Sequence, residues 1–139
     1  MRKALIVGID DYEQCPLYGC CNDADDIAKT LSRNEDGSPN FSVRLEKNVM
    51  TKGNLRKLIE ECFSGDSDVA LFYFSGHGHI DSVGGYLVTP DFSEYDYGVT
   101  LQDVLSIANN SKCKEKFIIL DSCYSGFMGR INSKGQVQQ

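Results

Sequence analysis

The chain has 139 residues, of which 41% are hydrophobic and 24% charged, and its formal net charge is −6. This length and composition are those of one globular domain. The acidic balance argues against a nucleic-acid partner, because proteins that bind phosphate backbones present a basic face. No apolar run reaches the roughly 20 residues that cross a bilayer, and the run after Met1-Arg2-Lys3 is too short for a secretion signal. We therefore expect a cytoplasmic protein that binds neither nucleic acid nor membrane.

The six cysteines indicate neither a metal site nor a disulfide framework. They form no C-x-x-C pair, and neither of the two histidines lies at a zinc-ligand spacing from them. Disulfides are rare in proteins without a secretion signal, so we expect most of the thiols to be free and to fill core positions. The six are Cys15, Cys20, Cys21, Cys62, Cys113 and Cys123.

The first half of the chain predicts two strands and two helices. Residues 3–9 form a continuous apolar run, which is typical of a strand buried on both faces. Residues 22–31 open with Asn22-Asp23, which favours a helix start. After a turn, residues 41–45 alternate as an outer strand would, and Thr51 is placed to cap a second helix with an apolar stripe.

The second half continues the same alternation. Residues 69–74 predict another buried strand, residues 84–91 a short excursion or hairpin, and Thr100 the cap of a third helix that ends near residue 108. Residues 117–120 predict a last buried strand. Strands that alternate with helices indicate an α/β fold with a mostly parallel sheet, whose functional residues lie at the carboxyl ends of the strands.

Two polar, glycine-flanked segments follow the buried strands. The sequence SGHG places His77 after one strand, and DSCYSG places Cys123 after another, 46 residues later. An imidazole beside a thiol promotes the thiolate, which is the nucleophilic form of cysteine. We expect the backbone amides of Gly78 and Cys123 to face a developing oxyanion. We expect His79, close by, to be a rim or surface residue.

FYFSGHG followed by FIILDSCYSG resembles the two signatures of the caspase/metacaspase clan of cysteine peptidases. The segments ALIVGIDDY and LYGCCNDADDIAKTL resemble the first strand and first helix of that family, so the resemblance extends from residue 3 to about residue 128. It implies a three-layer α/β/α sandwich with a mostly parallel central sheet. It also implies a cysteine endopeptidase with Cys123 as nucleophile and His77 as base.

The resemblance is closer to metacaspases than to caspases, because Asp121-Ser122-Cys123 stands where caspases have Gln-Ala-Cys. In metacaspases the matching aspartates, here Asp121 and Asp23, line the S1 pocket, and Ser75 matches a serine of that pocket. Two buried carboxylates would select an arginine or lysine side chain. Caspases hold aspartate with arginines, and residues 17–23 contain none. The resemblance therefore implies cleavage after Arg or Lys.

We expect no cofactor and no metal. Calcium-dependent metacaspases carry an acidic run after the histidine motif, whereas residues 79–86 hold a single carboxylate. A calcium site needs six to eight oxygens, several of them from carboxylates. Asp91, Glu94 and Asp96 are the alternative for a looser calcium site.

The resemblance also divides the chain into a large (p20-type) catalytic domain, residues 1–128, and a polar tail or linker, residues 129–139. The family fold continues with a smaller p10-like portion that completes the substrate cleft, and the strand at residues 117–120 would be an apolar sheet edge without it. We therefore expect a protein or peptide substrate and a p10-like partner portion. As given, the chain is expected to be a large-subunit fragment that can be inactive.

Three other functions stay open from the sequence. The chain can be a catalytically silent scaffold or regulatory fragment with the same fold, although the presence of both His77 and Cys123 argues against it. It can be an Asp-specific protease of the caspase type. A different α/β fold with a cysteine hydrolase or transferase site would leave Asp121 and Asp23 without a role.

Overall fold

The computed structural model describes residues 1–123, with Cys123 described by its backbone. Nine elements follow one another along these residues. They are β1 (Arg2–Gly8), α1 (Cys20–Ser32), β2 (Ser42–Lys47), α2 (Lys52–Cys62), β3 (Val69–Ile80), β4 (Gly85–Ser93), β5 (Asp96–Thr100), α3 (Leu101–Asn109) and β6 (Glu115–Cys123). The predicted domain boundary at residue 128 lies outside the described residues.

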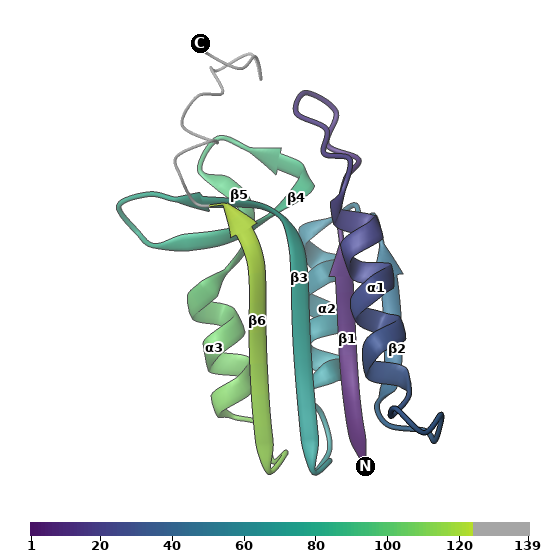
Figure 1. Ribbon diagram of the computed structural model, residues 1–139. Coiled ribbons are helices and arrows are strands. Elements are labelled where there is room, and N and C mark those ends of the chain that lie inside the picture. Colours follow the sequence, from purple (N-terminus) through teal and green to yellow (C-terminus); the bar gives the residue numbers. More distant parts are fainter. Residues whose placement is uncertain (124–139) are drawn as a thin grey trace.

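The main sheet is parallel, and β3 lies inside it. The strands run in the order β2, β1, β3, β6, with each neighbouring pair parallel (Figure 1). β3 is longer than its neighbours, and its last residues, 78–80, pair in the antiparallel sense with β4, which in turn pairs with β5. The strand that carries the histidine motif therefore passes from one sheet into a second, smaller one.

Helices cover both faces of the main sheet, as the alternation of buried residues requires. Ala4 and Ile6 of β1 pack in one cluster with Ala24 and Ala28 of α1. The intervening β1 side chains, Leu5 among them, pack on the other face with α2 and α3. Figure 1 shows α1 on one side of the sheet and α2 and α3 on the other. This confirms the expected three-layer α/β/α sandwich.

Two helix caps agree with the sequence, and a third differs. The side chains of Thr51 and Thr100 accept hydrogen bonds from backbone amides in the first turns of α2 and α3. α1 begins at Cys20, two residues before the predicted start, and its N-cap Gly19 has no side chain to offer. A carboxylate from outside the helix, Asp10, accepts from the first amides instead. The start of α1 is thus set by a contact ten residues away.

The strand ends also differ from expectation. β3 and β6 continue through His77 and Cys123, so both motifs lie in paired strand rather than in loops beyond it. β5 was not predicted from the sequence. None of the helices within residues 1–123 is long and apolar enough to cross a bilayer.

Candidate active site

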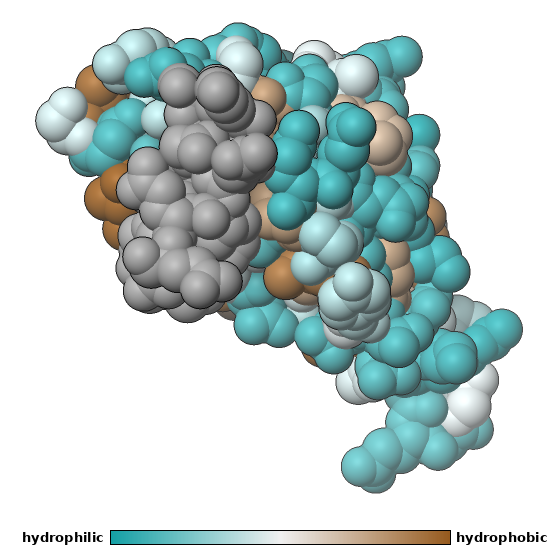
Figure 2. Space-filling view, turned by 90° about the horizontal axis from the view of Figure 1, so that it is seen from above, coloured by the Kyte–Doolittle hydropathy of each residue, from teal (hydrophilic) through white to brown (hydrophobic). Residues whose placement is uncertain are grey.

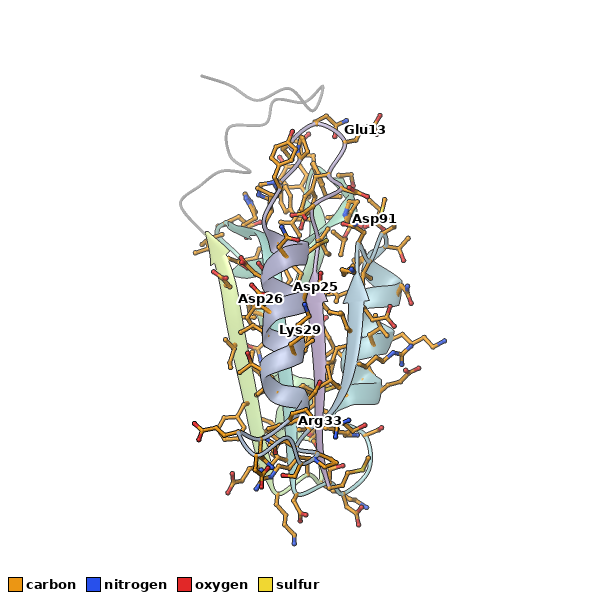
Figure 3. The ribbon with its side chains drawn as sticks, turned by 45° about the vertical axis from the view of Figure 1, so that its right-hand side comes forward. Glu13, Asp25, Asp26, Lys29, Arg33 and Asp91 are labelled. Atoms are coloured by element: carbon orange, nitrogen blue, oxygen red, sulfur yellow. The ribbon has the colours of Figure 1, made fainter. Side chains whose placement is uncertain are left out.

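The two motifs meet at the upper end of the main sheet. In the parallel pairing of β3 with β6, the Cα partner of His77 is Cys123, and the partner of Ser75 is Asp121. The predicted adjacency of the two strand ends is therefore present in the backbone. The loop between β1 and α1, with Glu13 near its tip, rises above these strand ends, whereas Arg33 lies at the far end of α1 (Figure 3).

The His77 side chain is held by the loop between β1 and α1. It is 7% exposed, and its Nε2 lies 2.7 Å from the carbonyl oxygen of Cys15. A carbonyl oxygen can only accept, so the proton between them belongs to Nε2. The lone pair of the neutral ring is therefore at Nδ1, which makes Nδ1 the atom that can accept a proton.

Burial keeps this imidazole neutral. Removal from water lowers the pKa of His77 below its usual value, and the hydrogen bond to the Cys15 carbonyl offsets part of this. The thiol of Cys15 is buried too, which raises its pKa to about 11, so it carries no charge near the ring at neutral pH. The local environment therefore favours a neutral base at pH 7.

The loop that supplies the Cys15 carbonyl is tied down at several points. The carboxylate of Asp10 accepts hydrogen bonds from the backbone amides of Cys20 (2.9 Å) and Cys21 (3.1 Å), at the positive end of α1. Burial alone would raise the pKa of Asp10, but these bonds outweigh it and the pKa is lowered. Asn48, in the left-handed backbone region with φ 57°, accepts from the amide of Asp10 through its side chain.

A second group of polar side chains lies on the α1 side of the same strand ends. The Tyr73 hydroxyl, on β3, donates to the Asp121 carboxylate at 3.2 Å. The pKa of Tyr73 is raised to about 12 by burial, then by the negative charge of Asp121 and, more weakly, of Asp23, while the nearby Ser75 hydroxyl acts in the opposite direction. All three residues predicted to line S1 therefore act on one buried tyrosine.

Close packing of α1 on β1 brings Asp23 to this place. A Cβ on Gly8 would lie 2.5 Å from the carbonyl oxygen of Cys20, so the first turn of α1 approaches the strand more closely than any other residue would permit. Asp23 lies in that first turn.

The expectation that the two S1 carboxylates are buried is wrong for the described residues. Asp23 and Asp121 are both exposed, whereas Ser75 is 1% exposed. Asp121 lies on β6, which pairs with β3 on one side and has no partner on its other side within residues 1–123, and Asp23 lies in the first turn of α1. The assignment of Asp23, Ser75 and Asp121 to an S1 pocket stays a prediction.

Gly78 and Cys123 occupy the positions where the sheets diverge. Gly78 is the first residue of β3 whose partner, Leu87, belongs to β4, and Cys123 is the last residue of β6. The amide just before Gly78, that of His77, already donates to the hydroxyl of Tyr12. The assignment of the oxyanion to Gly78 and Cys123 stays a prediction.

Three contributors to this site were missed by sequence reasoning. Tyr12 lies in the segment ALIVGIDDY and Tyr73 in a predicted strand, and neither position signals a role in the site. The third is the main-chain carbonyl of Cys15, which every residue type would supply and which therefore leaves no signal in a sequence. His79 was placed wrongly at the rim: it is 5% exposed and stacks on Tyr97 with ring centroids 3.9 Å apart.

Two of the three acidic residues considered for a looser calcium site, Asp91 and Asp96, have other partners. Asp91 accepts from the backbone amide of Lys52 at 3.1 Å and from the hydroxyl of Thr89. The side chain of Lys52 pairs with Asp96, and Asp81 accepts from amides of its own turn. Among residues 1–123 no three carboxylate, histidine or cysteine side chains are grouped so that they could hold a metal ion.

Comparison with known proteins identifies the family of the chain. The profile of the caspase domain, peptidase family C14, matches residues 1–139. Metacaspase-3 of Trypanosoma cruzi (strain CL Brener) is 30% identical over 86 residues, an alignment that covers 55% of this chain and 24% of that protein. The chain thus spans about a quarter of the length of the curated relative that it matches. This chain belongs to the caspase-domain family of cysteine peptidases, C14.

Proposed function

We propose that this domain is the catalytic portion of an endopeptidase that cleaves after arginine or lysine, with Cys123 as nucleophile and His77 as base. The observation that carries the proposal is the register of β3 and β6, which sets His77 beside Cys123. The bond from Nε2 to the Cys15 carbonyl adds to it, because it leaves Nδ1 as the basic atom.

The chemistry follows the usual order of acyl transfer. His77 Nδ1 takes the thiol proton of Cys123, and the thiolate attacks the scissile carbonyl carbon. The amides of Gly78 and Cys123 hold the resulting oxyanion. The carbon–nitrogen bond breaks as the imidazolium returns its proton to the leaving amine. Water, deprotonated by Nδ1, then hydrolyses the thioester and releases Cys123. No step needs a metal or an organic cofactor.

The proposed specificity rests on charge. Asp23 and Asp121 both place negative charge close to Tyr73, and Ser75, on the same strand as Tyr73, is buried. A guanidinium can bond a carboxylate through two parallel N–H donors, and an ammonium can bond it through one. An aspartate side chain at P1 would meet repulsion from the same two groups, which disfavours the Asp-specific alternative.

The open edge of β6 supports a partner portion for this domain. Phe117 and Ile119 are 45% and 47% exposed, although they lie in the middle of an apolar strand. We propose that a p10-like portion pairs with β6, covers these side chains and closes the far wall of the S1 pocket. A domain without that portion would bind substrate weakly, so the silent-fragment alternative applies to the chain on its own.

Hydrolysis of matched fluorogenic peptides tests the proposal. The peptides differ only at P1 (Arg, Lys or Asp) and are offered to this chain and to the complete protein that contains it, with calcium or with a chelator. We expect cleavage of the Arg and Lys peptides by the complete protein, insensitive to chelator and absent in Cys123→Ala. Labelling by an arginyl chloromethylketone should disappear in the same variant.

The other outcomes are equally informative. Cleavage of the Asp peptide would contradict the S1 assignment while leaving the His77–Cys123 pair in place. Cleavage that stops with chelator would contradict a metal-free enzyme. A folded, complete protein that cleaves none of the peptides would favour the scaffold function.

A further inference from the structure

Tyr12 makes two contacts with His77 and a third with the neighbouring strand β4. It is 1% exposed, and its hydroxyl accepts a hydrogen bond from the backbone amide of His77 at 3.1 Å. The same hydroxyl donates to the carbonyl oxygen of Val88 in β4 at 2.8 Å. Its ring lies 4.4 Å from the imidazole between centroids, tilted by 55°. One side chain thus contacts the backbone and the ring of the proposed base.

The strand is shaped to admit this hydroxyl. A Cβ on Gly76 would lie 2.7 Å from the Tyr12 hydroxyl oxygen and 2.7 Å from the ring of Phe74. Real Cβ atoms do not approach other atoms so closely, so a larger residue at position 76 would displace the tyrosine. The glycine before His77 therefore has a packing reason that involves Tyr12, apart from any role in substrate approach.

Tyr12 and the Cys15 carbonyl come from the same loop. The amide of Tyr12 donates to the carbonyl of Asp10 at 2.9 Å, and so does the amide of Leu17. The loop therefore turns back on itself between these residues, with Asp10 fixed to the start of α1. A displacement of Tyr12 would shift the carbonyl that receives the Nε2 proton, three residues further on.

We propose that Tyr12 is a positioning residue for the base: its hydroxyl fixes the His77 backbone, and its ring fixes the imidazole plane, so that Nε2–H points at the Cys15 carbonyl and Nδ1 is kept for the proton transfer. Tyr12 acts through His77 and contacts no reacting atom. The inference rests on the proposed function for the role of His77. The orientation of the ring is measurable without any peptidase activity.

The groups around the imidazole allow the titration of His77 to be followed without interference from Tyr12 and Cys15. The loop contributes Tyr12 and Cys15, whose hydroxyl and thiol are both kept protonated near neutral pH because burial raises their pKa values. β6 contributes Cys123 at the paired position, and β3 contributes His79 two residues on. Among these groups, His77 and His79 are the ones whose residue type has a reference pKa near neutrality, about 6.5.

Long-range proton–nitrogen NMR spectra of the chain identify the tautomer of each histidine, and the chain has only two. In the unmodified protein we expect the Nε2–H tautomer at His77, with a pKa below the usual value. Tyr12→Phe removes the hydroxyl and leaves the His77 amide and the Val88 carbonyl without this partner. We expect mixed tautomers at His77, a pKa that rises toward the ordinary value, and a kcat about 10- to 100-fold lower in the complete protein, with KM changed far less.

Tyr86→Phe is the matched control, because Tyr86 is another buried tyrosine, 8% exposed, that stacks near His79. It should leave the His77 signals unchanged. An unaltered tautomer and pKa at His77 in Tyr12→Phe would overturn the proposal. If Tyr12→Phe does not fold, Gly76→Ala decides, since its methyl group displaces the same hydroxyl: altered His77 signals support the positioning role, and unchanged signals refute it.

The experiments distinguish failure of the proposed peptidase function from failure of the proposed role of Tyr12. Absent peptide hydrolysis with a shifted His77 tautomer would refute the peptidase and keep the role of Tyr12 in orienting the ring. Normal hydrolysis by Tyr12→Phe, with an unchanged acid limb of its pH profile, would refute the role of Tyr12 and keep the peptidase.

Discussion

His77 and Asp121 lie on neighbouring strands at the same end of the sheet, yet their surroundings are opposite. His77 is 7% exposed and is fixed through its ring nitrogen and its backbone amide. Asp121 is exposed, and its carboxylate accepts a hydrogen bond from the Tyr73 hydroxyl at 3.2 Å. β3 has strand partners on both sides, whereas β6 pairs with β3 alone within residues 1–123.

This contrast indicates that the proposed base and the proposed specificity residues depend on different parts of the protein. The contacts that hold His77, the proposed base, come from the loop between β1 and α1, from β3 and, through Tyr12, from β4, all within the described residues. The carboxylates of Asp23 and Asp121 are instead exposed on the α1 side of the strand ends, although burial would strengthen their bonds to a cationic side chain. We infer that the proposed base is preorganised in this domain and that the proposed specificity pocket needs a further wall. Figure 2 shows the molecule from above, and most of the described residues visible on this face are hydrophilic.

Replacement of the proposed base should have the largest effect. In His77→Gln the thiol of Cys123 loses its proton acceptor, so we expect kcat to fall by about 10²- to 10⁴-fold with KM affected much less. Steady-state kinetics with the Arg peptide measure this. His79→Gln is the matched control, because it removes the other buried histidine of the same strand. Equal losses in the two variants would contradict the assignment of the base.

The pH profile sharpens the same prediction. Because burial lowers the pKa of His77, the ring stays neutral to a lower pH than a free imidazole, and the acid limb of kcat/KM should lie below about 6.5. The free energy of unfolding should also fall at acid pH. The histidine of the unfolded chain takes up a proton near pH 6.5, whereas the folded histidine takes it up only at a lower pH, so the folded protein becomes less stable as the pH falls below about 6.5. An acid limb above pH 7 would contradict the buried, neutral base.

Replacement of the exposed carboxylates should lower activity less than replacement of His77, and only for peptides with arginine or lysine at P1. Asp121→Asn and Asp23→Asn each remove a charge from the proposed pocket, so kcat/KM for the Arg peptide should fall by about 10- to 100-fold, the equivalent of one charge-assisted hydrogen bond. Asp26→Asn is the matched control, because Asp26 is exposed on the same helix (Figure 3). Losses that are the same for Asp23→Asn and Asp26→Asn would indicate a general effect of charge and would contradict the S1 assignment.

The sequence predicted the parts of this molecule that local signals determine. The apolar run of β1 and the threonine caps of α2 and α3 lie where they were expected, and the two motifs lie on neighbouring strands, although inside the paired strands rather than beyond them. Each of these is encoded within a few neighbouring residues: a period, a cap or a glycine. The family resemblance then placed the elements in order, and the caspase-domain match confirms it.

The contacts that position the site were not predictable in the same way. Asp10 sets the start of α1 from ten residues away, and Tyr12 reaches across 65 residues to His77. The Cys15 carbonyl is main chain and carries no residue identity. The exposure of Asp23 and Asp121 was missed because exposure depends on which other parts of the molecule cover a residue, and the residue types at positions 23 and 121 do not encode that.

The anchor of the loop should have a moderate effect on stability. In Asp10→Asn one acceptor and the negative charge at the start of α1 are lost, and we expect the free energy of unfolding to fall by about 1 kcal/mol, or roughly 4 °C in Tm. Thermal unfolding followed by circular dichroism measures this.

The pH dependence of the Tm difference between Asp10→Asn and the unmodified protein shows whether the charge of Asp10 causes the loss of stability. The folded-state pKa of Asp10 is lowered, so its contribution is present above about pH 4 and is lost as the pH falls through the folded value. The gap between Asp10→Asn and the unmodified protein should therefore narrow below pH 4. Asp11→Asn, an exposed neighbour, should change Tm little at any pH. A gap that persists at pH 2 would show that the charge of Asp10 is not the cause.

The smallest effect on stability, and the most direct test of the open edge, is expected from Ile119→Lys. Ile119 is 47% exposed on β6, so a lysine there costs little burial, and the free energy of unfolding should change by no more than about 0.5 kcal/mol. A charge on an unpaired strand disfavours edge-to-edge association, so sedimentation velocity should show less self-association of this chain. Leu105→Lys, at an equally exposed apolar position on α3 (50%), should leave the association unchanged. If both variants reduce it equally, general hydrophobicity drives the association; if only Ile119→Lys does, the edge of β6 is the surface that a partner strand would cover.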